Sequence, residues 1–250
     1  MLEKIELDEI IPSSRKYPYI DFKAEKPSGK EILTVKNLCK TVDGKKILNK
    51  VSFSMLKGDK IAIVGLDEMA KTMLFKILVG EEKFDSGEVL WGKTITKSYF
   101  PQDNSEYFKD DISIMEWIAR YYNVDDETYI RGFLGRMLFS GEDVFKKVNV
   151  LSGGEKARCM LSKMMLEARN MLILDEPTAH LDLESITSLN KGLINTDNEV
   201  IFASHDHEIV NTTANRIIEI LPTGVIDRRM TYDEYLEDSE VKRIREESYK

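Results

Sequence analysis

Residues 151–181 read LSGGEKARCMLSKMMLEARNMLILDEPTAHL and hold three short patterns in a fixed order. Residues 151–155, LSGGE, form a glycine turn that opens a helical pattern. Residues 171–174, MLIL, are an apolar run that Asp175 and Glu176 follow directly. Four apolar residues in a row fit a strand that is buried on both faces of a parallel sheet. The stretch therefore predicts an α/β fold with two acids at the end of a central strand.

These two acids are candidates for chemistry because functional groups in open α/β sheets gather at the carboxyl ends of the strands. An acid placed there can hold Mg²⁺, directly or through water. The next acid can orient or deprotonate an attacking water. A lone Asp-Glu pair is usually a solvated turn. A buried strand directly before Asp175 and a phosphate-loop pattern upstream favour the functional interpretation.

A second apolar run, KIAIV at residues 60–64, leads directly into GLDEMAKT at residues 65–72. The phosphate-loop pattern is G-x-x-x-x-G-K-[ST], and only Ala70 departs from it. Backbone N–H groups of such a loop point at phosphates, and the helix N-terminus that follows favours anions. The pattern predicts that Lys71 contacts the β- and γ-phosphates and that Thr72 faces Mg²⁺.

The alanine at position 70 leaves two alternatives open. It costs roughly 1 kcal/mol if the backbone there needs a positive φ. It costs nothing, and favours the helix, if the position is already helical. By itself the segment is equally compatible with a plain strand–turn–helix carrying a surface lysine.

Composition limits the classes of protein. The chain has 250 residues, a formal net charge of −8 and two cysteines, Cys39 and Cys159, which form no metal or disulfide pattern. Its apolar runs are too short to span a bilayer and none has a signal-peptide layout. A transporter subunit with its own membrane domain is therefore excluded. The acidic charge argues against nucleic-acid binding over the whole surface, although a local basic patch remains possible.

The other segments are assigned from apolar periodicity and turn residues. We expect strands at residues 33–53, around a turn at Asp43-Gly44, and at 86–89, 95–100 and 199–204, with a hairpin at 215–228. We expect helices at residues 1–11, 183–194 and 231–250, and an α-helical subdomain at residues 111–150.

The glycine turn, the strand that ends in two acids and the segment TAHLD at residues 178–182 together resemble the signature motif, Walker B strand and D-loop of ATP-binding-cassette (ABC) ATPases. The resemblance covers nearly the whole chain. It implies an α/β fold: an ABC-type P-loop NTPase cassette with a RecA-like core sheet, an N-terminal antiparallel β-subdomain and a small α-helical subdomain. The implied limits are a linker tail at 1–30, the nucleotide-binding domain at 31–230 with its helical subdomain at about 111–168, and a charged helical tail at 231–250.

The resemblance also implies site residues, with ATP and Mg²⁺ as ligands. Gln102 matches the Q-loop glutamine and His205 the switch histidine that contacts the γ-phosphate, so both join Glu176 as catalytic residues. The metal residues are Thr72, Gln102 and Asp175. The remaining ATP-binding residues are Val42, Gly65, Leu66, Asp67, Glu68, Met69, Ala70, Lys71, Thr72 and Met73, and, toward the nucleotide of a partner cassette, Ser152, Gly153, Gly154 and Glu155.

Finer details are similar to the second cassette of ABC-F proteins, with the YbiT-like branch as the nearest match. They lie at residues 13–20, which resemble the end of the inter-cassette linker, and at residues 132–140, 204–206 and 232–236. This resemblance implies a cytoplasmic ATP-driven switch on the ribosome and its RNA, with no membrane contact. The implied partner is the N-terminal cassette of the same polypeptide, or a second copy placed head-to-tail. A single cassette should then hydrolyse ATP slowly or not at all.

Two other functions remain open. Asp67, Glu68, Ala70 and Met73 replace the usual loop residues, and Val42 stands where an aromatic residue usually stacks on adenine. Ala179 replaces the usual Asn of the D-loop. These departures favour a degenerate cassette that serves as a binding or scaffolding half. The third possibility is the ATPase subunit of a transporter, against which the linker-like N-terminus and the short helical subdomain count.

Overall fold

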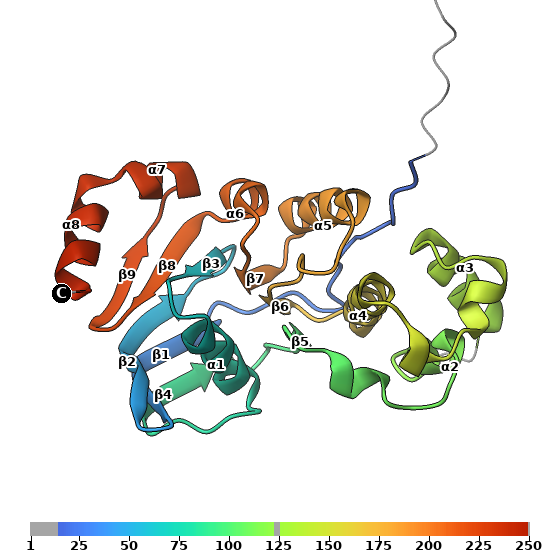
Figure 1. Cartoon of the computed structure of the whole chain (residues 1–250), viewed down its shortest axis with the longest axis horizontal. Helices are drawn as coiled ribbons and strands as arrows, with labels where there is room; N and C mark the ends of the chain where they lie inside the picture. Colours follow the sequence, from blue (N-terminus) through green and yellow to red (C-terminus); the bar gives the residue numbers. More distant parts are fainter. Residues whose placement is uncertain (1–14, 123–125, 250) are drawn as a thin grey trace, which may run out of the picture.

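The computed structural model describes residues 15–122 and 126–249 (Figure 1). The helix expected at residues 1–11 lies outside the described residues. The strands are β1 (Leu33–Val42), β2 (Lys45–Met55), β3 (Lys60–Val64), β4 (Ser86–Trp91), β5 (Lys97–Phe100), β6 (Met171–Asp175), β7 (Glu199–Ala203), β8 (Arg216–Leu221) and β9 (Gly224–Arg228). The α-helices are α1 (Glu68–Val79), α2 (Ile114–Ala119), α3 (Glu127–Arg136), α4 (Gly153–Glu167), α5 (Leu183–Asn195), α6 (His207–Thr213), α7 (Tyr232–Glu237) and α8 (Ser239–Ser248).

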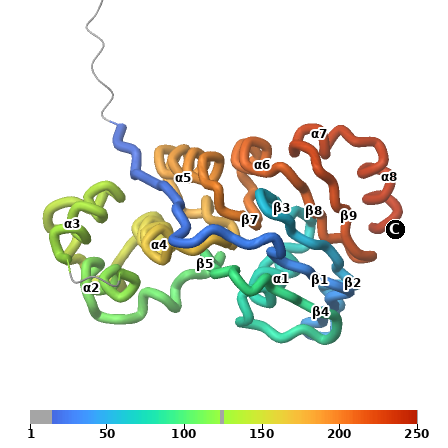
Figure 2. The backbone as a smooth tube through the Cα atoms, turned by 180° about the vertical axis from the view of Figure 1, so that it is seen from behind, coloured from blue at the N-terminus to red at the C-terminus, as the bar shows by residue number. Residues whose placement is uncertain are grey.

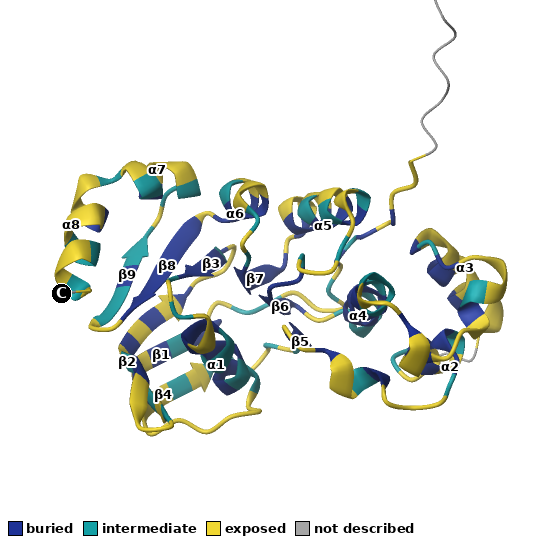
Figure 3. Ribbon diagram, viewed as in Figure 1, coloured by how far each residue is buried: buried dark blue, intermediate teal, exposed yellow. Residues whose placement is uncertain are grey.

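The central sheet has the strand order β5-β6-β7-β3-β8-β9. Neighbouring strands of this sheet are parallel from β5 through β6, β7 and β3 to β8, and the β8–β9 pair is antiparallel. Every residue of β6 and β7 is buried, as Figure 3 shows, so the strands predicted from their apolar runs are confirmed. The phosphate loop follows β3, the acid pair spans the end of β6, and His205 follows β7, so parallel pairing places all three at one edge of the sheet.

Alternate residues of the central strands belong to two different apolar cores. Ile61 and Ile63 of β3 pack in the core that includes helix α1 and the antiparallel sheet. Ala62 and Val64 pack in the core that includes helices α4, α5 and α6. This alternation follows from the period of two along a strand, and it holds helix α1 against one face of the sheet.

The second sheet is antiparallel, with the order β2-β1-β4. Its β1–β2 turn lies at Asp43-Gly44, where both residues have positive φ, 48° and 79°. Positive φ at both central residues is the geometry that Asp-Gly favours in a two-residue hairpin. The predicted hairpin is therefore confirmed.

The helical region after β5 is built on the predicted periodicity. Trp117 of α2 is 1% exposed and its ring stacks on Phe108 at a centroid distance of 4.9 Å. Helix α3 adds Ile130, Phe133 and Leu134 to the same core. In Figure 1, α2 and α3 lie at the far side of α4 from the central sheet.

Both ends of the described chain pack onto the body of the molecule. Residues 15–32 cross the face of the molecule that Figure 2 shows, and Ile20 and Phe22 are buried. The Thr196 hydroxyl donates to the Phe22 carbonyl at 2.8 Å. At the other end, the Tyr235 hydroxyl donates to Glu219 of β8 at 2.6 Å, which fixes α7 on the central sheet.

Candidate functional site

The loop between β3 and α1 has the geometry of a phosphate loop. Gly65 has φ 141°, and a Cβ there would stand 2.7 Å from the Ile220 carbonyl oxygen, so only glycine fits. The Asp67 carboxylate caps α1 by accepting from the Ala70 N–H at 3.2 Å. Ala70 lies within α1, so of the two alternatives above the structure supports the one in which alanine costs nothing.

A lysine that the sequence analysis did not identify supports this loop. Lys45 Nζ, at the start of β2, lies 2.8 Å from Asp67 Oδ2. The hydrogen bond from Lys45 holds the pKa of the Asp67 carboxyl below its usual value. No local pattern marks this lysine, because the contact joins the β1–β2 hairpin to a separate loop.

The three predicted metal residues lie together. The Thr72 hydroxyl donates to Gln102 Oε1 at 3.2 Å. Asp175 is 1% exposed and its Oδ2 has no hydrogen-bond partner among the described residues. Burial raises the pKa of the Asp175 carboxyl to about 6, and a hydrogen bond from Thr72 opposes that rise. A hydroxyl, an amide oxygen and an orphaned carboxylate oxygen are hard oxygen donors, so these residues fit Mg²⁺.

Beside them lies a cluster of Glu68, Lys71, Glu176 and His205, here called the loop cluster. Lys71 Nζ is 2.8 Å from Glu68 Oε1 and 4.0 Å from Glu176 Oε1. His205 Nε2 is 3.5 Å from each of the same two carboxylate oxygens. The Glu68 carboxylate therefore stands between the lysine and the histidine, in the place of an anion that both could bind.

Glu176 is held firmly in this cluster. Its side chain is 4% exposed, and its Oε2 accepts the His205 backbone N–H at 3.0 Å. Burial raises the pKa of the Glu176 carboxyl, whereas the His205 hydrogen bond lowers it. Its backbone has φ 49°, a conformation that costs a non-glycine residue roughly 1–2 kcal/mol and often occurs at functional sites. Its Oε1 lacks a hydrogen-bond partner within the described ranges, as suits a group that acts on water.

The predicted signature residues lie elsewhere. Ser152 caps α4 in a capping box with Glu155, whose carboxylate accepts the Ser152 N–H at 2.9 Å. Gly153 and Gly154 pack against His180, 3.2 Å and 3.0 Å from the positions that a Cβ would take. Across the described residues, no hydrogen bond or ion pair joins this turn to the phosphate loop. The chain thus brings together the loop residues but not the signature.

The remaining predicted residues line the loop or its hairpin. Leu66 and Met69 are 78% and 50% exposed, whereas Met73 is partly buried against the apolar core of α1. Val42 ends β1, pairs with Lys45 across the hairpin and packs against the same core. The side chain of Val42 therefore offers neither an aromatic ring nor a polar group.

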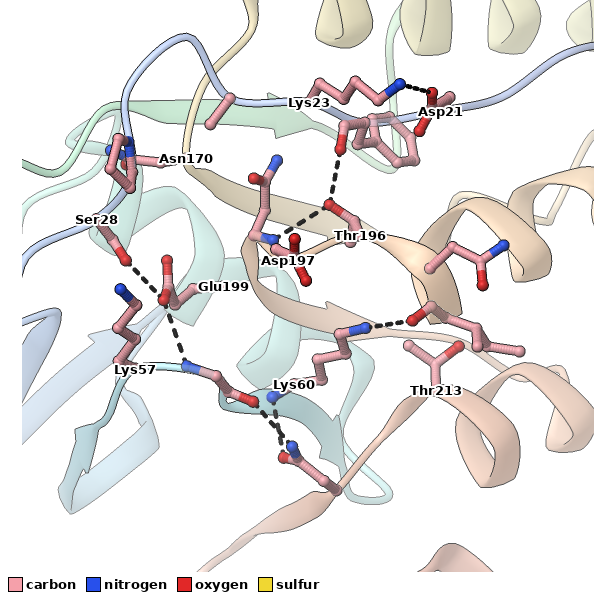
Figure 4. Close-up of a pocket in the computed structure, with 18 of the residues that line it drawn as sticks. Asp21, Lys23, Ser28, Lys57, Lys60, Asn170, Thr196, Asp197, Glu199 and Thr213 are labelled. Carbon is pink, nitrogen blue, oxygen red and sulfur yellow. Dashed lines mark hydrogen bonds and ion pairs between the residues drawn. The ribbon is translucent and has the colours of Figure 1, made fainter.

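A cavity of about 1080 Å³ lies against the N-terminal segment, residues 15–32, and none of the loop cluster residues lines it (Figure 4). Several of its polar groups hold that segment and the adjacent elements in place. Ser28 donates to Glu199 Oε1 at 2.8 Å, and Lys60 Nζ donates to the Leu193 carbonyl at 2.8 Å. Since it gathers none of the predicted site residues, the loop cluster remains the better candidate site.

Comparison with known families agrees with this geometry. The family model described as ABC transporter matches residues 48–179, which is more than half of the chain. The chain belongs to the ABC transporter family. It is an ATP-binding ABC ATPase cassette. ATP hydrolysis is the general activity of that family.

Curated relatives of this cassette are longer proteins. The chain is 57% identical to the uncharacterized ABC transporter ATP-binding protein YkpA of Bacillus subtilis, covering 100% of the chain and 46% of YkpA. It is 41% identical to the probable ATP-binding protein YbiT of Escherichia coli O157:H7, with 94% and 44% covered. It is 36% identical to ABC transporter F family member 2 of Arabidopsis thaliana, with 98% and 37% covered. The chain thus spans less than half of each of these relatives.

Solved cassettes share the fold at low identity. A dimeric ATP-binding cassette in a post-hydrolysis state, bound to ADP and Pi, matches with a TM-score of 0.67 at 17% identity over 79% of this chain and 98% of its own. A bacterial Atm1-family ABC exporter with ATP bound matches with a TM-score of 0.71 at 16% identity over 91% of this chain and 44% of its own. The predicted cassette fold is confirmed. None of the helices within the described residues is long and apolar enough to cross a membrane.

Proposed function

We propose that this cassette binds and hydrolyses Mg-ATP as the second cassette of a soluble ABC-F protein of the YbiT-like branch. In that protein ATP drives a conformational switch on the ribosome, in the cytoplasm. The observation that carries the proposal is the convergence of Lys71, Thr72, Asp175, Glu176 and His205 at one edge of the sheet. Its relatives include members named for the F family, which supports the branch.

The residues divide into binding and catalytic roles. The loop N–H groups and Lys71 hold the β- and γ-phosphates, while Thr72, Gln102 and Asp175 hold Mg²⁺. When bound, Mg²⁺ supplies charge neutralisation of the phosphate oxygens. Glu176 orients or deprotonates the attacking water, and its raised pKa suits a base that must accept a proton. His205 contacts the γ-phosphate from the end of β7.

A partner cassette completes the site. Among the described residues, no hydrogen bond or ion pair joins the N-terminus of α4 to the loop cluster, so Ser152, Gly153 and Gly154 would serve the nucleotide of a facing cassette. Each cassette then supplies the phosphate loop of one nucleotide site and the signature turn of the other. This arrangement predicts weak turnover by the isolated chain.

The test is ATP turnover measured against protein concentration. A specific activity that rises steeply with concentration, or on adding the first cassette, supports partner dependence. Fast turnover at constant specific activity would contradict it. In the Glu176→Gln variant, turnover should fall while ATP and the partner cassette remain bound together, which gel filtration with labelled ATP detects.

A scaffolding cassette is the second candidate, and Glu68 is the observation that favours it. Its carboxylate already pairs with Lys71 at 2.8 Å, where phosphate should bind. If Glu68 stays in place, nucleotide is excluded, and Glu176→Gln changes neither nucleotide retention nor partner binding. Indifference to that variant therefore separates the scaffold from the ATPase.

The ribosomal role has its own test. Co-sedimentation of the complete protein carrying Glu176→Gln, with ATP, should place it with ribosomes. Recovery with membranes instead would support a transporter ATPase.

A further inference from the structure

A cavity of about 540 Å³ adjoins the outer side of the phosphate loop. Loop residues Leu66 and Met69 form one wall, Ile47 of β2 forms another, and Pro222 of the β8–β9 turn a third. The lining also holds the charged residues Lys45, Lys46, Asp67 and Glu68. Ligand sites are typically such apolar clefts with a few polar groups at their mouth.

Tyr249, near the C-terminal end of the chain, also lines this cavity. It follows α8 and is 44% exposed, so much of the residue remains accessible to a ligand. Burial raises the pKa of the Tyr249 hydroxyl, and backbone hydrogen bonding from Leu66 acts in the opposite direction. Tyr249 lines the cavity together with Leu66 and Met69, so it lies beside the loop that is to hold the phosphates.

Helix α8 is anchored firmly enough to position this ring. Arg245 Nε donates to Glu219 Oε2 at 2.6 Å, and Tyr235 of α7 donates to the same carboxylate oxygen at 2.6 Å. Glu219 is 3% exposed and belongs to β8, so the anchor reaches the central sheet. Ser248 also contacts Thr223 in the β8–β9 turn.

We propose that this cavity is the nucleobase subsite and that Tyr249 is the residue against which the base stacks. The inference rests on nucleotide binding by the phosphate loop. An aromatic face binds a base through stacking, and Val42, at the end of the hairpin, offers none. The Lys45–Asp67 ion pair at 2.8 Å lies on the cavity wall, where it can contact the polar edge of the base or the ribose. The C-terminal helix thereby becomes part of the nucleotide site.

The test compares Mg-ATP with Mg-tripolyphosphate, which carries the phosphates without the base. By calorimetry, Tyr249→Ala should weaken Mg-ATP binding by about tenfold and leave tripolyphosphate binding unchanged, whereas Tyr249→Phe should bind both as the wild type does. The matched control is Tyr17→Ala, which removes another half-exposed tyrosine that lines neither the loop nor this cavity.

A fluorescent variant gives a second readout. In Tyr249→Trp, Mg-ATP should quench the new indole emission and tripolyphosphate should not. Equal ATP affinity of Tyr249→Ala and wild type, or equal quenching by both ligands, would overturn the stacking assignment and leave phosphate binding intact. A wild-type chain that binds neither ligand would overturn the proposed function itself, and the subsite with it.

Discussion

Two helix N-termini in this cassette bear glycine-containing turns, and they are built in opposite ways. Helix α1 is capped by Asp67, whose carboxylate also pairs with Lys45 from another element. Helix α4 is capped by Ser152 in a box closed by its own Glu155. The N-terminus of α1 is surrounded by Lys45 of β2, Glu176 after β6 and His205 after β7. The N-terminus of α4 has its backbone N–H groups capped by neighbouring residues of its own helix.

This difference shows which part of the nucleotide site a single cassette can form by itself. Both helix ends have N–H groups that suit an anion. Only the end at α1 is surrounded by side chains that can hold a metal and act on water. The end at α4 is complete as a structure and incomplete as a site, which is the arrangement expected of a surface that meets another cassette.

The largest effect is expected at the α1 end, from Lys71→Ala. This side chain is 6% exposed and pairs with Glu68 and Glu176. Its loss should weaken Mg-ATP binding about 100-fold by calorimetry, because a charge-assisted contact to phosphate disappears. The control is Lys36→Ala, which removes a lysine of an exposed surface pair with Glu88. Unchanged affinity would show that α1 is no more a phosphate site than α4.

Asp175→Asn should change the stability of the ligand-free chain in a pH-dependent way. The folded pKa of Asp175 is about 6, against an ordinary value of 3.8, so the folded state binds the proton more tightly. Its stabilising contribution is present below pH 3.8 and is lost as the pH rises toward 6. The variant should therefore gain about 2 kcal/mol at pH 8 and almost nothing at pH 4, by urea unfolding.

The exposed residue Asp85 supplies the matched control. Asp85→Asn should show no such pH-dependent gain. A gain by Asp175→Asn that is the same at both pH values would show that the buried charge is not its cause.

Glu68→Gln sharpens the comparison by freeing Lys71. The variant should bind Mg-ATP about tenfold more tightly, and Mg-ADP less than about threefold more tightly, because the carboxylate occupies the position between Lys71 and His205 that suits a γ-phosphate. Glu88→Gln, in the exposed pair with Lys36, serves as the control. Equal gains for both nucleotides would place Glu68 away from the γ-phosphate.

The smallest effect is expected at the α4 end. Ser152→Ala removes an N-cap and should cost about 1 kcal/mol of stability by urea unfolding. Mg-ATP affinity of the isolated chain should not change, since no hydrogen bond or ion pair among the described residues joins this turn to the loop. A loss of affinity in the same chain would break the comparison, because it would mean that α4 already serves the local site.

Much of the architecture could be predicted from local pattern. The apolar runs of β3, β6 and β7 are buried on both faces, and Asp43-Gly44 makes the expected hairpin. Parallel strands put their carboxyl ends at one edge, so the meeting of Lys71 with Glu176 followed from the fold class. The Lys45–Asp67 pair carried no local signal, because it joins the β1–β2 hairpin to a separate loop.

The sequence by itself determined the elements whose causes are short-range: buried strands, the glycine at position 65, the capped helices and the acids after β6. These depend on a residue and its near neighbours, so they can be read from the chain. Only the tertiary structure decided that His205 lies against Glu68, and that Tyr249 lines the same cavity as Leu66. Such contacts join segments that are remote along the chain, and their distances are set by how the sheets and helices pack.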